Sequence, residues 1–451
     1  MPSSPSESRS ATLQSMSTRQ PGIQPKSASR TTPKDYEMVH MKRQIPKIKD
    51  FAPLLKFKMP EADATARRLS NAHTIADLRR IAKRRTPAGP FDYTDGAADH
   101  EVSIERSRQA FLDVEFQPGI LRNVASVDMT TSILGKDSAL PFGMAPTGFT
   151  RMMHSAGERA VVTAAAKAGI PYSLSTVGTT SIEDVAAAAP EGRKWFQLYL
   201  WKNRELSLEL ISNAEKAGYD TLIITVDVPT SGNRVRDLKN GMSIPPQLTV
   251  KTLLDASYRP EWWINFLTTE PYSFAFDRSG SGSLGDLVTA LYDSTVTFED
   301  LRWMREVWKG HLVVKGIQTV GDAERAFDYG ADGIVVSNHG GRQLDRAPVP
   351  FHLLPRIVDQ VGDRGAVMLD TGITSGADIV AAIALGADFT LIGRAYLYGL
   401  MAGGEAGVTR CIEILSSEIE RTMKLLGVTS VAELNRDHVR ALTRSVPIPV
   451  A

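Results

Sequence analysis

A short polar segment of this sequence has residue types and spacing that suit acid–base chemistry on a small anion. His339 follows Ser337 and Asn338 and precedes two glycines, and Arg342 stands three residues further on. A histidine can take up a proton near neutral pH, and a guanidinium holds a carboxylate through two parallel hydrogen bonds. A lone histidine is more often structural, but this combination favours a functional one.

Lys315 is the second candidate, because it ends the apolar run Leu312–Val314. An ammonium group at such a buried place needs an anion or a strong acceptor beside it. We expect a bound ligand to supply that acceptor. The alternative is a purely structural salt bridge, to Asp227 or Asp370.

Glycine turns after two late apolar runs favour a phosphate site. Asp370-Thr371-Gly372 follows one run, Gly376 stands close behind it, and Gly393-Arg394 follows the next run. Backbone N–H groups in such turns, together with a helix N-terminus, can hold a phosphate. Glycine turns also occur for backbone reasons alone, but their pairing with Arg394 favours phosphate binding.

The elements that must position these residues recur as one unit from Leu140 onward: a short apolar run, a polar turn and a helical stretch. Eight runs are apolar on both faces, as parallel strands covered by helices are. The runs are Pro141–Ala145, Pro171–Ser175, Trp195–Leu200, Thr221–Val226, Leu312–Val314, Gly333–Val336, Ala366–Leu369 and Phe389–Ile392. Glycines end the helical patterns Glu158–Ala168, Asn203–Ala217, Asp322–Tyr329 and Ala377–Leu385. Eight alternating units predict an α/β protein with a closed (β/α)₈ TIM barrel, and a doubly wound open sheet is the weaker alternative.

Three regions lie outside this repeat. Residues 227–311 form a long insertion after the fourth run, with a Gly-Ser tract from Ser279 and a returning helix expected over Thr297–Trp308. Residues 70–135 precede the barrel and contain two helical patterns. Residues 1–45 are basic, Ser-rich and poor in large apolar groups, which predicts a disordered tail before a single domain over residues 46–451.

Composition narrows the function classes. Lys and Arg number 52 against 51 Asp and Glu, so no basic excess indicates nucleic acid. No apolar run is long enough to span a membrane. The single cysteine, Cys411, suits a reducing cytosol and falls in a helical pattern, so we expect it to pack in the core of a cytoplasmic protein. No Gly-x-Gly-x-x-Gly follows a strand, which argues against NAD, and we predict no metal site.

The segment Ser337-Asn-His-Gly-Gly-Arg-Gln-Leu-Asp345 resembles the signature of FMN-dependent 2-hydroxy-acid dehydrogenases and oxidases. The resemblance covers residues 70–430, and bacterial L-lactate dehydrogenases of the respiratory type are the most similar members. Further segments carry it: Phe91–Gly96, Ala145–Gly148, Trp195–Tyr199, Thr225–Pro229, Val314–Gly316 and Ile392–Arg394. The resemblance implies FMN as cofactor, an L-2-hydroxy acid such as L-lactate as substrate, a quinone or another respiratory carrier as electron acceptor, and a homo-tetramer.

The same resemblance implies roles for single residues. The catalytic residues are His339 as base, Asp227 as its carboxylate partner, and Tyr199. The substrate site is formed by Tyr93, Tyr199, Arg234 and Arg342. The flavin contacts are Ala145, Pro146, Thr147, Thr176, Gln197, Thr225, Lys315, Ser337, Asp370, Thr371, Gly372, Gly393 and Arg394. One position departs from the family, because Thr374 stands where an arginine commonly contacts the flavin phosphate.

Two other functions remain open at this point. An oxidase that reduces oxygen would share all of these residues. A non-redox, phosphate-binding isomerase or aldolase would use Lys315 as a Schiff-base lysine, but it leaves His339 and the two arginines unexplained. The insertion also carries Trp262, Trp263, Phe266 and Leu267, which could contact the inner face of the cell membrane or could simply pack over the barrel.

Overall fold

The computed structural model describes residues 47–51, 61–240, 254–255, 257–270 and 293–442. The chain divides into two units, Met1–Met59 and Pro60–Ala451. In the first unit only residues 47–51 are described, with helix α1 at Ile48–Phe51. The tail predicted over residues 1–45 and the Gly-Ser tract from Ser279 lie outside the described residues.

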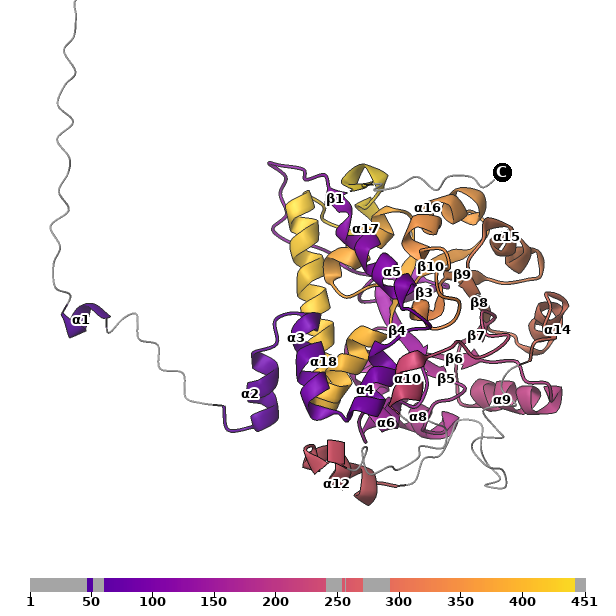
Figure 1. The fold of residues 1–451 in the computed structure, drawn as a ribbon. Helices are drawn as coiled ribbons and strands as arrows, with labels where there is room; N and C mark the ends of the chain where they lie inside the picture. Colours follow the sequence, from indigo (N-terminus) through magenta and orange to yellow (C-terminus); the bar gives the residue numbers. More distant parts are fainter. Residues whose placement is uncertain (1–46, 52–60, 241–253, 256, 271–292, 443–451) are drawn as a thin grey trace, which may run out of the picture. The chain divides into compact units, whose positions relative to one another are not determined.

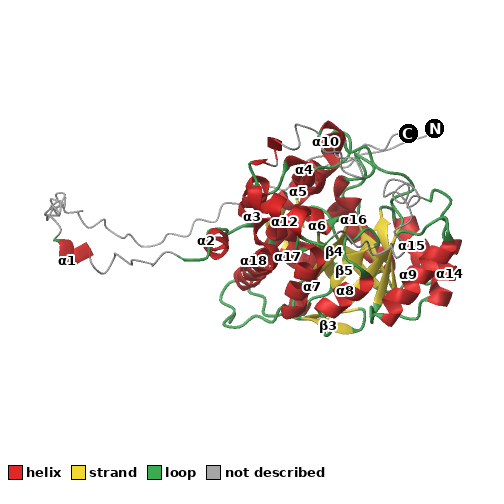
Figure 2. Cartoon of the chain, turned by 90° about the horizontal axis from the view of Figure 1, so that it is seen from below, coloured by secondary structure: helices red, strands yellow, loops and turns green. Residues whose placement is uncertain are grey.

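Eight parallel strands of the second unit close into a barrel in the order β10-β11-β4-β5-β6-β7-β8-β9, which confirms the predicted architecture. The strands are β4 (Phe142–Thr147), β5 (Tyr172–Ser175), β6 (Lys194–Leu198), β7 (Thr221–Thr225), β8 (His311–Ile317), β9 (Gly333–Val336), β10 (Ala366–Leu369) and β11 (Phe389–Ile392). The last three have the predicted bounds. Figure 2 shows the strands enclosed by helices.

Helices follow the barrel strands. They are α6 (Thr150–Met153), α7 (Gly157–Lys167), α8 (Ile182–Ala188), α9 (Arg204–Lys216), α10 (Val235–Lys239), α12 (Pro260–Thr268), α14 (Glu299–Val307), α15 (Val320–Asp328), α16 (Pro350–Val361), α17 (Gly376–Ala384) and α18 (Arg394–Leu426). Of these, α10 and α12 belong to the long insertion after β7. The predicted helices match α7, α9, α14, α15 and α17 with ends shifted by no more than two residues. Side-chain caps precede three of them, α9, α15 and α17, and at α17 Ser375 forms a capping box with Asp378.

The segment before the barrel corrects the sequence prediction. Where two helical patterns were predicted, the structure has three helices, α3 (Ile75–Arg85), α4 (Ala88–Asp95) and α5 (Val102–Leu112), and α2 (Ala64–Ser70) precedes them. Of these helices, α4 is short and contains Pro90, so it lacks a clear apolar stripe. Helix α3 runs beside α18 (Figure 1).

Short elements complete the fold. Strand β1 (Val114–Phe116) pairs with β12 (Val439–Ala441), and β2 (Thr131–Ile133) pairs with β3 (Lys136–Ser138), both antiparallel. Single 3₁₀ turns are η1 (His339–Gly341), η2 (Val431–Glu433) and η3 (Arg436–His438). None of the helices in the described ranges combines the length and the hydrophobicity that crossing a bilayer requires.

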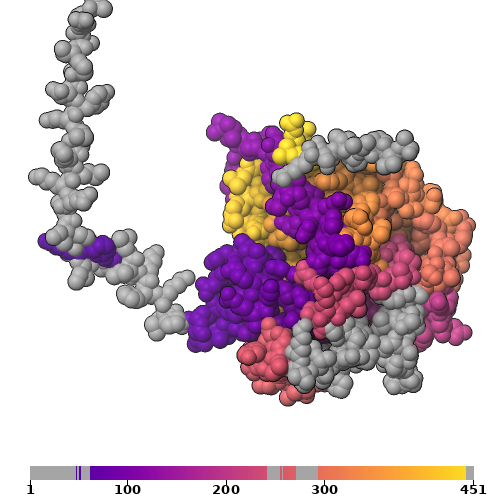
Figure 3. All heavy atoms as spheres, viewed as in Figure 1, coloured from indigo at the N-terminus to yellow at the C-terminus, as the bar shows by residue number. Residues whose placement is uncertain are grey.

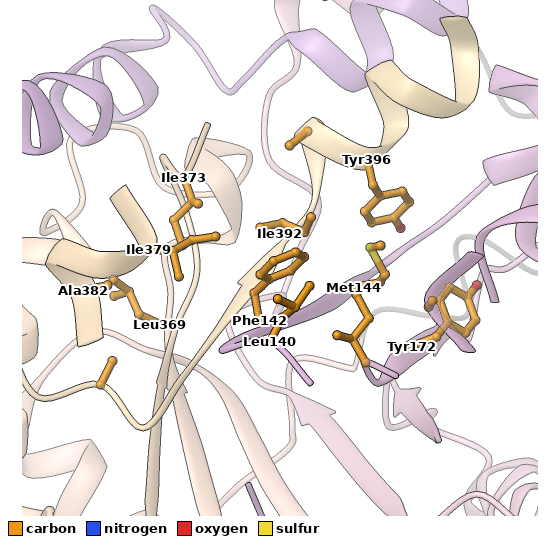
Figure 4. Packing of buried hydrophobic residues seen from close by; sticks show 14 of the residues in the cluster. Leu140, Phe142, Met144, Tyr172, Leu369, Ile373, Ile379, Ala382, Ile392 and Tyr396 are labelled. Carbon is orange, nitrogen blue, oxygen red and sulfur yellow. The ribbon is translucent and has the colours of Figure 1, made fainter. Parts of the chain in front are cut away.

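Strand alternation divides the core into two layers and thereby places the functional residues. One apolar cluster fills the barrel interior: Ile133, Leu134, Ala145, Trp195, Ile223, Val313, Val335, Met368, Phe389 and Leu391. The alternate strand residues pack outward against the helices, as Figure 4 shows for Phe142 and Ile392 and for Leu369 beside Ile379 and Ala382. Cys411 is fully buried in that outer layer, which confirms its predicted core packing.

Side chains alternate between the two faces of a strand, so the residue two positions after an inward-facing core residue also faces inward. From Trp195, Ile223, Val313, Val335 and Met368 this step leads to Gln197, Thr225, Lys315, Ser337 and Asp370. These five polar residues stand at the carboxyl ends of five adjacent strands. The barrel therefore places a polar layer directly above its apolar interior.

Candidate active site

A cavity of about 720 Å³ opens at the carboxyl ends of the barrel strands. Fourteen residues predicted for the site line it: Tyr93, Ala145, Pro146, Thr147, Tyr199, Arg234, Lys315, His339, Arg342, Asp370, Thr371, Gly372, Gly393 and Arg394. Five predicted residues do not line it: Thr176, Gln197, Thr225, Asp227 and Ser337. Of these five, Thr176, Asp227 and Ser337 form hydrogen bonds to the lining residues Tyr199, His339 and Lys315.

His339 and Asp227 form a buried pair between the loops after β9 and β7. His339 Nδ1 lies 2.9 Å from Asp227 Oδ1. Since a carboxylate accepts, Nδ1 carries the hydrogen and Nε2 keeps the lone pair that can take a proton. The backbone of His339 is left-handed (φ 57°), and its N–H donates to Ser337 Oγ at 3.0 Å. The pair also needs Gly316, because a Cβ there would lie 2.8 Å from Asp227 Cβ and Cγ.

The surroundings of this pair keep the imidazole ready to act as a base. Burial lowers the pKa of His339 below its ordinary value, although Asp227 acts in the opposite direction. Burial alone would raise the pKa of Asp227, but His339 and then Lys315 hold that pKa below its ordinary value. At neutral pH the pair is therefore a neutral imidazole hydrogen-bonded to a carboxylate, and that carboxylate stabilises the imidazolium once a proton arrives.

Two guanidinium groups create an anion site beside this base. The guanidinium carbons of Arg342 and Arg234 lie 4.6 and 5.6 Å from the centre of the Tyr93 ring. Arg342 also donates to the backbone carbonyls of Tyr93 and Gly96. Burial and the nearby charge of Arg234 lower the pKa of Arg342 to about 10, so it stays protonated at neutral pH. A bound carboxylate would relieve the repulsion between the two cations.

Lys315 is ion-paired within the barrel mouth. Its Nζ lies 3.1 Å from Asp370 Oδ2 and donates to Ser337 Oγ at 3.2 Å. Burial would lower the pKa of Lys315, but Asp370 and Asp227 raise that pKa above its ordinary value. Of the two salt bridges considered from the sequence, the structure has the one to Asp370. A Schiff-base lysine needs a lowered pKa instead, so the isomerase or aldolase alternative loses its nucleophile.

The buried donors around Lys315 fit a flavin. In the described part of the chain, Gln197 Nε2 and Thr225 Oγ1 are buried without a hydrogen-bond partner. The Gln197 amide is oriented, because its Oε1 accepts a 3.0 Å hydrogen bond from Ser175 Oγ. Such buried groups need a partner, and the oxygen and nitrogen acceptors of a flavin ring would supply one. Thr176 serves differently: its hydroxyl donates to Gln197 O and accepts from Tyr199 N, so it joins the ends of β5 and β6.

The glycine turns after β10 and β11 form the other end of the cavity. The backbone N–H groups of Thr374 and Ser375 donate to Asp378 Oδ2 at 2.8 and 3.0 Å, and Gly376 N–H donates to Glu418 Oε2 at 2.7 Å. The Gly376 N–H, predicted as a donor to phosphate, is thus used by Glu418 in this structure. Arg394 donates to Thr94 O at 2.9 Å and to Gly96 O at 2.6 Å, and it lines the cavity.

Arg108 is a cavity residue that sequence reasoning missed. It lies on α5, donates to Gly372 O and lies 2.7 Å from Asp378 Oδ2, so it reaches the turn that carries Thr374. Its two partners are 264 and 270 residues away in the chain, and nothing in its own segment indicates that contact. The guanidinium brings a positive charge to the end of the cavity where the arginine expected at position 374 is absent.

Comparisons with known proteins show which proteins this chain is similar to. The model of the family described as FMN-dependent dehydrogenase matches residues 82–441. A Mycobacterium tuberculosis protein provisionally named L-lactate dehydrogenase is 58% identical over 406 residues, which cover 90% of this chain and 98% of that protein. The L-lactate dehydrogenase of Caulobacter vibrioides is 41% identical over 369 residues, 80% of this chain and 96% of that protein. A crystal structure of the monotopic membrane protein (S)-mandelate dehydrogenase aligns with a TM-score of 0.80 at 37% identity, covering 82% of this chain and 100% of that chain.

Proposed function

The chain belongs to the FMN-dependent dehydrogenase family, and we propose that its substrate is L-lactate, which it oxidises to pyruvate. It is an FMN-dependent 2-hydroxy-acid dehydrogenase, and the similar proteins from Mycobacterium tuberculosis and Caulobacter vibrioides carry the lactate name. One observation supports the proposal above the others. His339, which is hydrogen-bonded to Asp227, and the two arginines line one cavity, so a base and a carboxylate site stand together.

Oxidation of a 2-hydroxy acid to a 2-oxo acid removes two electrons and two protons. Arg342 and Arg234 bind the carboxylate and orient the carbon that reacts, with Tyr93 and Tyr199 lining the site. His339 Nε2 accepts one proton, and Asp227 stabilises the resulting imidazolium. FMN would be held by the polar layer at the barrel mouth and, when bound, would accept the two electrons together with the second proton. Lys315 offsets negative charge that arises beside it.

The electron acceptor in this proposal is a quinone or another respiratory carrier, reached at the inner face of the cell membrane. The insertion helix α12 supports this, because Trp262 and Phe266 stack at 5.0 Å between ring centres while Ile264 and Leu267 are 60% and 72% exposed. The helix lies on the surface (Figure 3). It is attached to the body by a hydrogen bond from Trp262 Nε1 to Met152 O. The similar (S)-mandelate dehydrogenase is called a monotopic membrane protein. A homo-tetramer is part of the same proposal.

Anaerobic bleaching of the flavin by a panel of 2-hydroxy acids tests the substrate. We expect L-lactate to reduce the flavin faster than D-lactate, glycolate or L-mandelate at equal concentration. Faster reduction by another acid would reassign the substrate. For the acceptor, turnover with a soluble quinone analogue should far exceed turnover with oxygen, and comparable rates would make the protein an oxidase. Sedimentation with vesicles, lost in a Leu267→Asp variant, tests the membrane contact.

A further inference from the structure

The loop after β9 carries both His339 and Arg342 in an irregular backbone. His339, Gly340 and Gly341 have φ values of 57°, 66° and 73°, which are left-handed, and Arg346 follows with 63°. Such conformations persist only where the surroundings hold them. The position of the base and of one arginine therefore depends on side chains that anchor this loop.

Gln343 anchors the loop to the loop after β7. The side chain is buried, its Nε2 donates to Thr230 O at 2.8 Å and to Asp227 O at 3.2 Å, and its Oε1 accepts from Gly232 N–H at 3.2 Å. Both hydrogens and the oxygen of the amide are thus directed at one neighbouring loop. That neighbouring loop also carries Arg234.

The two loops touch along their backbones at this point. A Cβ added to Gly232 would lie 2.2 Å from Arg342 O, so the glycine permits an approach that a side chain would block. On its other side the β9 loop is held by Asp345, whose Oδ1 accepts from Ser103 N–H of α5 at 2.8 Å. Because Asp345 holds the β9 loop independently, loss of Gln343 would release mainly the β7 loop.

We propose that Gln343 is a positioning residue that sets the separation of His339 from Asp227 and of Arg342 from Arg234. This inference rests on the proposed function of these four residues. Each functional pair has one member on the β9 loop and one on the β7 loop, and the Gln343 amide joins the two loops. A neutral amide is required, because a carboxylate would face two carbonyl oxygens and an apolar side chain would leave three half-buried or exposed backbone groups without this partner.

The test compares Gln343→Met and Gln343→Glu with wild type, with Gln360→Met as the matched control. Gln360 is an exposed amide on α16 that bonds only to a surface glutamate, Glu324, among the contacts described. We expect the Gln343 variants to bind FMN normally. They should bleach with L-lactate up to about 10²-fold more slowly, since small displacements of reacting groups have large rate effects. They should also bind oxalate, a non-reacting dicarboxylate, more weakly. The control should match wild type in all three measurements.

A double-mutant cycle separates positioning from a general loss of stability. If Gln343 acts on the rate through the His339–Asp227 pair, adding Gln343→Met to His339→Ala should cause little further loss of bleaching rate. The same addition should still weaken oxalate binding. Full additivity of the two rate effects would overturn the proposal, as would wild-type bleaching and oxalate binding in FMN-loaded Gln343→Met. Failure of wild type to oxidise any 2-hydroxy acid would instead overturn the proposed function.

Discussion

The two ends of the cavity are built in different ways. At the substrate end, His339, Asp227, Arg342 and Arg234 all come from the loops after two strands, β9 and β7, that lie one strand apart. At the other end, where the flavin phosphate is proposed to bind and which we call the phosphate end, the turns after β10 and β11 are contacted by helices. Backbone N–H groups of the turn after β10 donate to Asp378 of α17 and Glu418 of α18, and the Gly372 carbonyl accepts from Arg108 of α5. The turns alone would have left these backbone groups without partners.

This difference shows what a barrel strand does and does not determine. A strand end sets the direction of its own inward side chain, and parallel neighbours bring such side chains together. The hydrogen-bond partners of a glycine turn are not set in this way, because any helix packed nearby can supply them. A single substitution at the substrate end should therefore have a large effect on activity. At the phosphate end several elements contribute to FMN binding, so each single substitution should have a smaller effect.

The largest expected effect is that of His339→Ala. The variant should keep its FMN, because His339 belongs to the substrate end, and should lose roughly 10²–10⁴-fold in the rate of flavin reduction by L-lactate. Anaerobic stopped-flow absorbance measures the rate, and the flavin spectrum before mixing is the control. Near-normal bleaching would show that the base is another residue.

Arg342→Lys should have the next largest effect, although it keeps the charge. One ammonium cannot reproduce the fork of a guanidinium, and a lost hydrogen bond to a charged group amounts to about 1.5–3 kcal/mol, roughly ten- to a hundredfold in kcat/KM. The exposed Arg346 of the same loop provides the matched control, Arg346→Lys. An unchanged KM and kcat in Arg342→Lys would remove Arg342 from the substrate site.

Arg394→Met tests the phosphate end. The variant should release FMN more readily, with a dissociation constant raised by about tenfold, because one charged donor is lost while backbone groups and Arg108 remain. Fluorescence titration of the apoprotein with FMN gives the constant. If the constant stays the same, the phosphate is held elsewhere. Thr374→Arg, which restores the arginine common in the family, should leave FMN binding at least as tight as in wild type.

Arg108→Met should weaken FMN binding less than Arg394→Met does. Arg108 is already ion-paired with Asp378, and its side chain is 30% exposed, so solvent screens its charge. Arg108→Lys should recover part of any loss, since it keeps the charge. A larger effect for Arg108 than for Arg394 would reverse the assignment of the two arginines at this end.

The smallest change concerns pH, because no group is removed. Burial lowers the pKa of His339, so the base is neutral above a pKa that lies below its ordinary value of about 6.5. The kcat/KM for L-lactate should fall with decreasing pH only below about pH 6.5 and stay level between there and neutrality. If the midpoint of this fall in kcat/KM lay above pH 7, the histidine would be protonated at neutral pH and more exposed than in this structure.

Much of the barrel could be predicted from local pattern. The runs over Gly333–Val336, Ala366–Leu369 and Phe389–Ile392 are apolar on both faces, and the structure has strands with the same bounds. Helix α4 shows where local pattern is insufficient, because that helix has little apolar periodicity and is held by tertiary packing instead. The hydrogen bonds of Thr176, which join the ends of β5 and β6, could not be predicted from its place after a strand.

The sequence by itself determined the eight strands, the residues that end them and their resemblance to one enzyme family, because strand alternation and short turns are local properties. Only the tertiary structure decided which of these residues meet, and through which partners. Arg108 reaches the Gly372 turn across 264 residues, and Gln343 holds Thr230 across 113. Such contacts depend on how helices and loops pack against the closed barrel, and packing between distant segments leaves no periodic pattern in the chain.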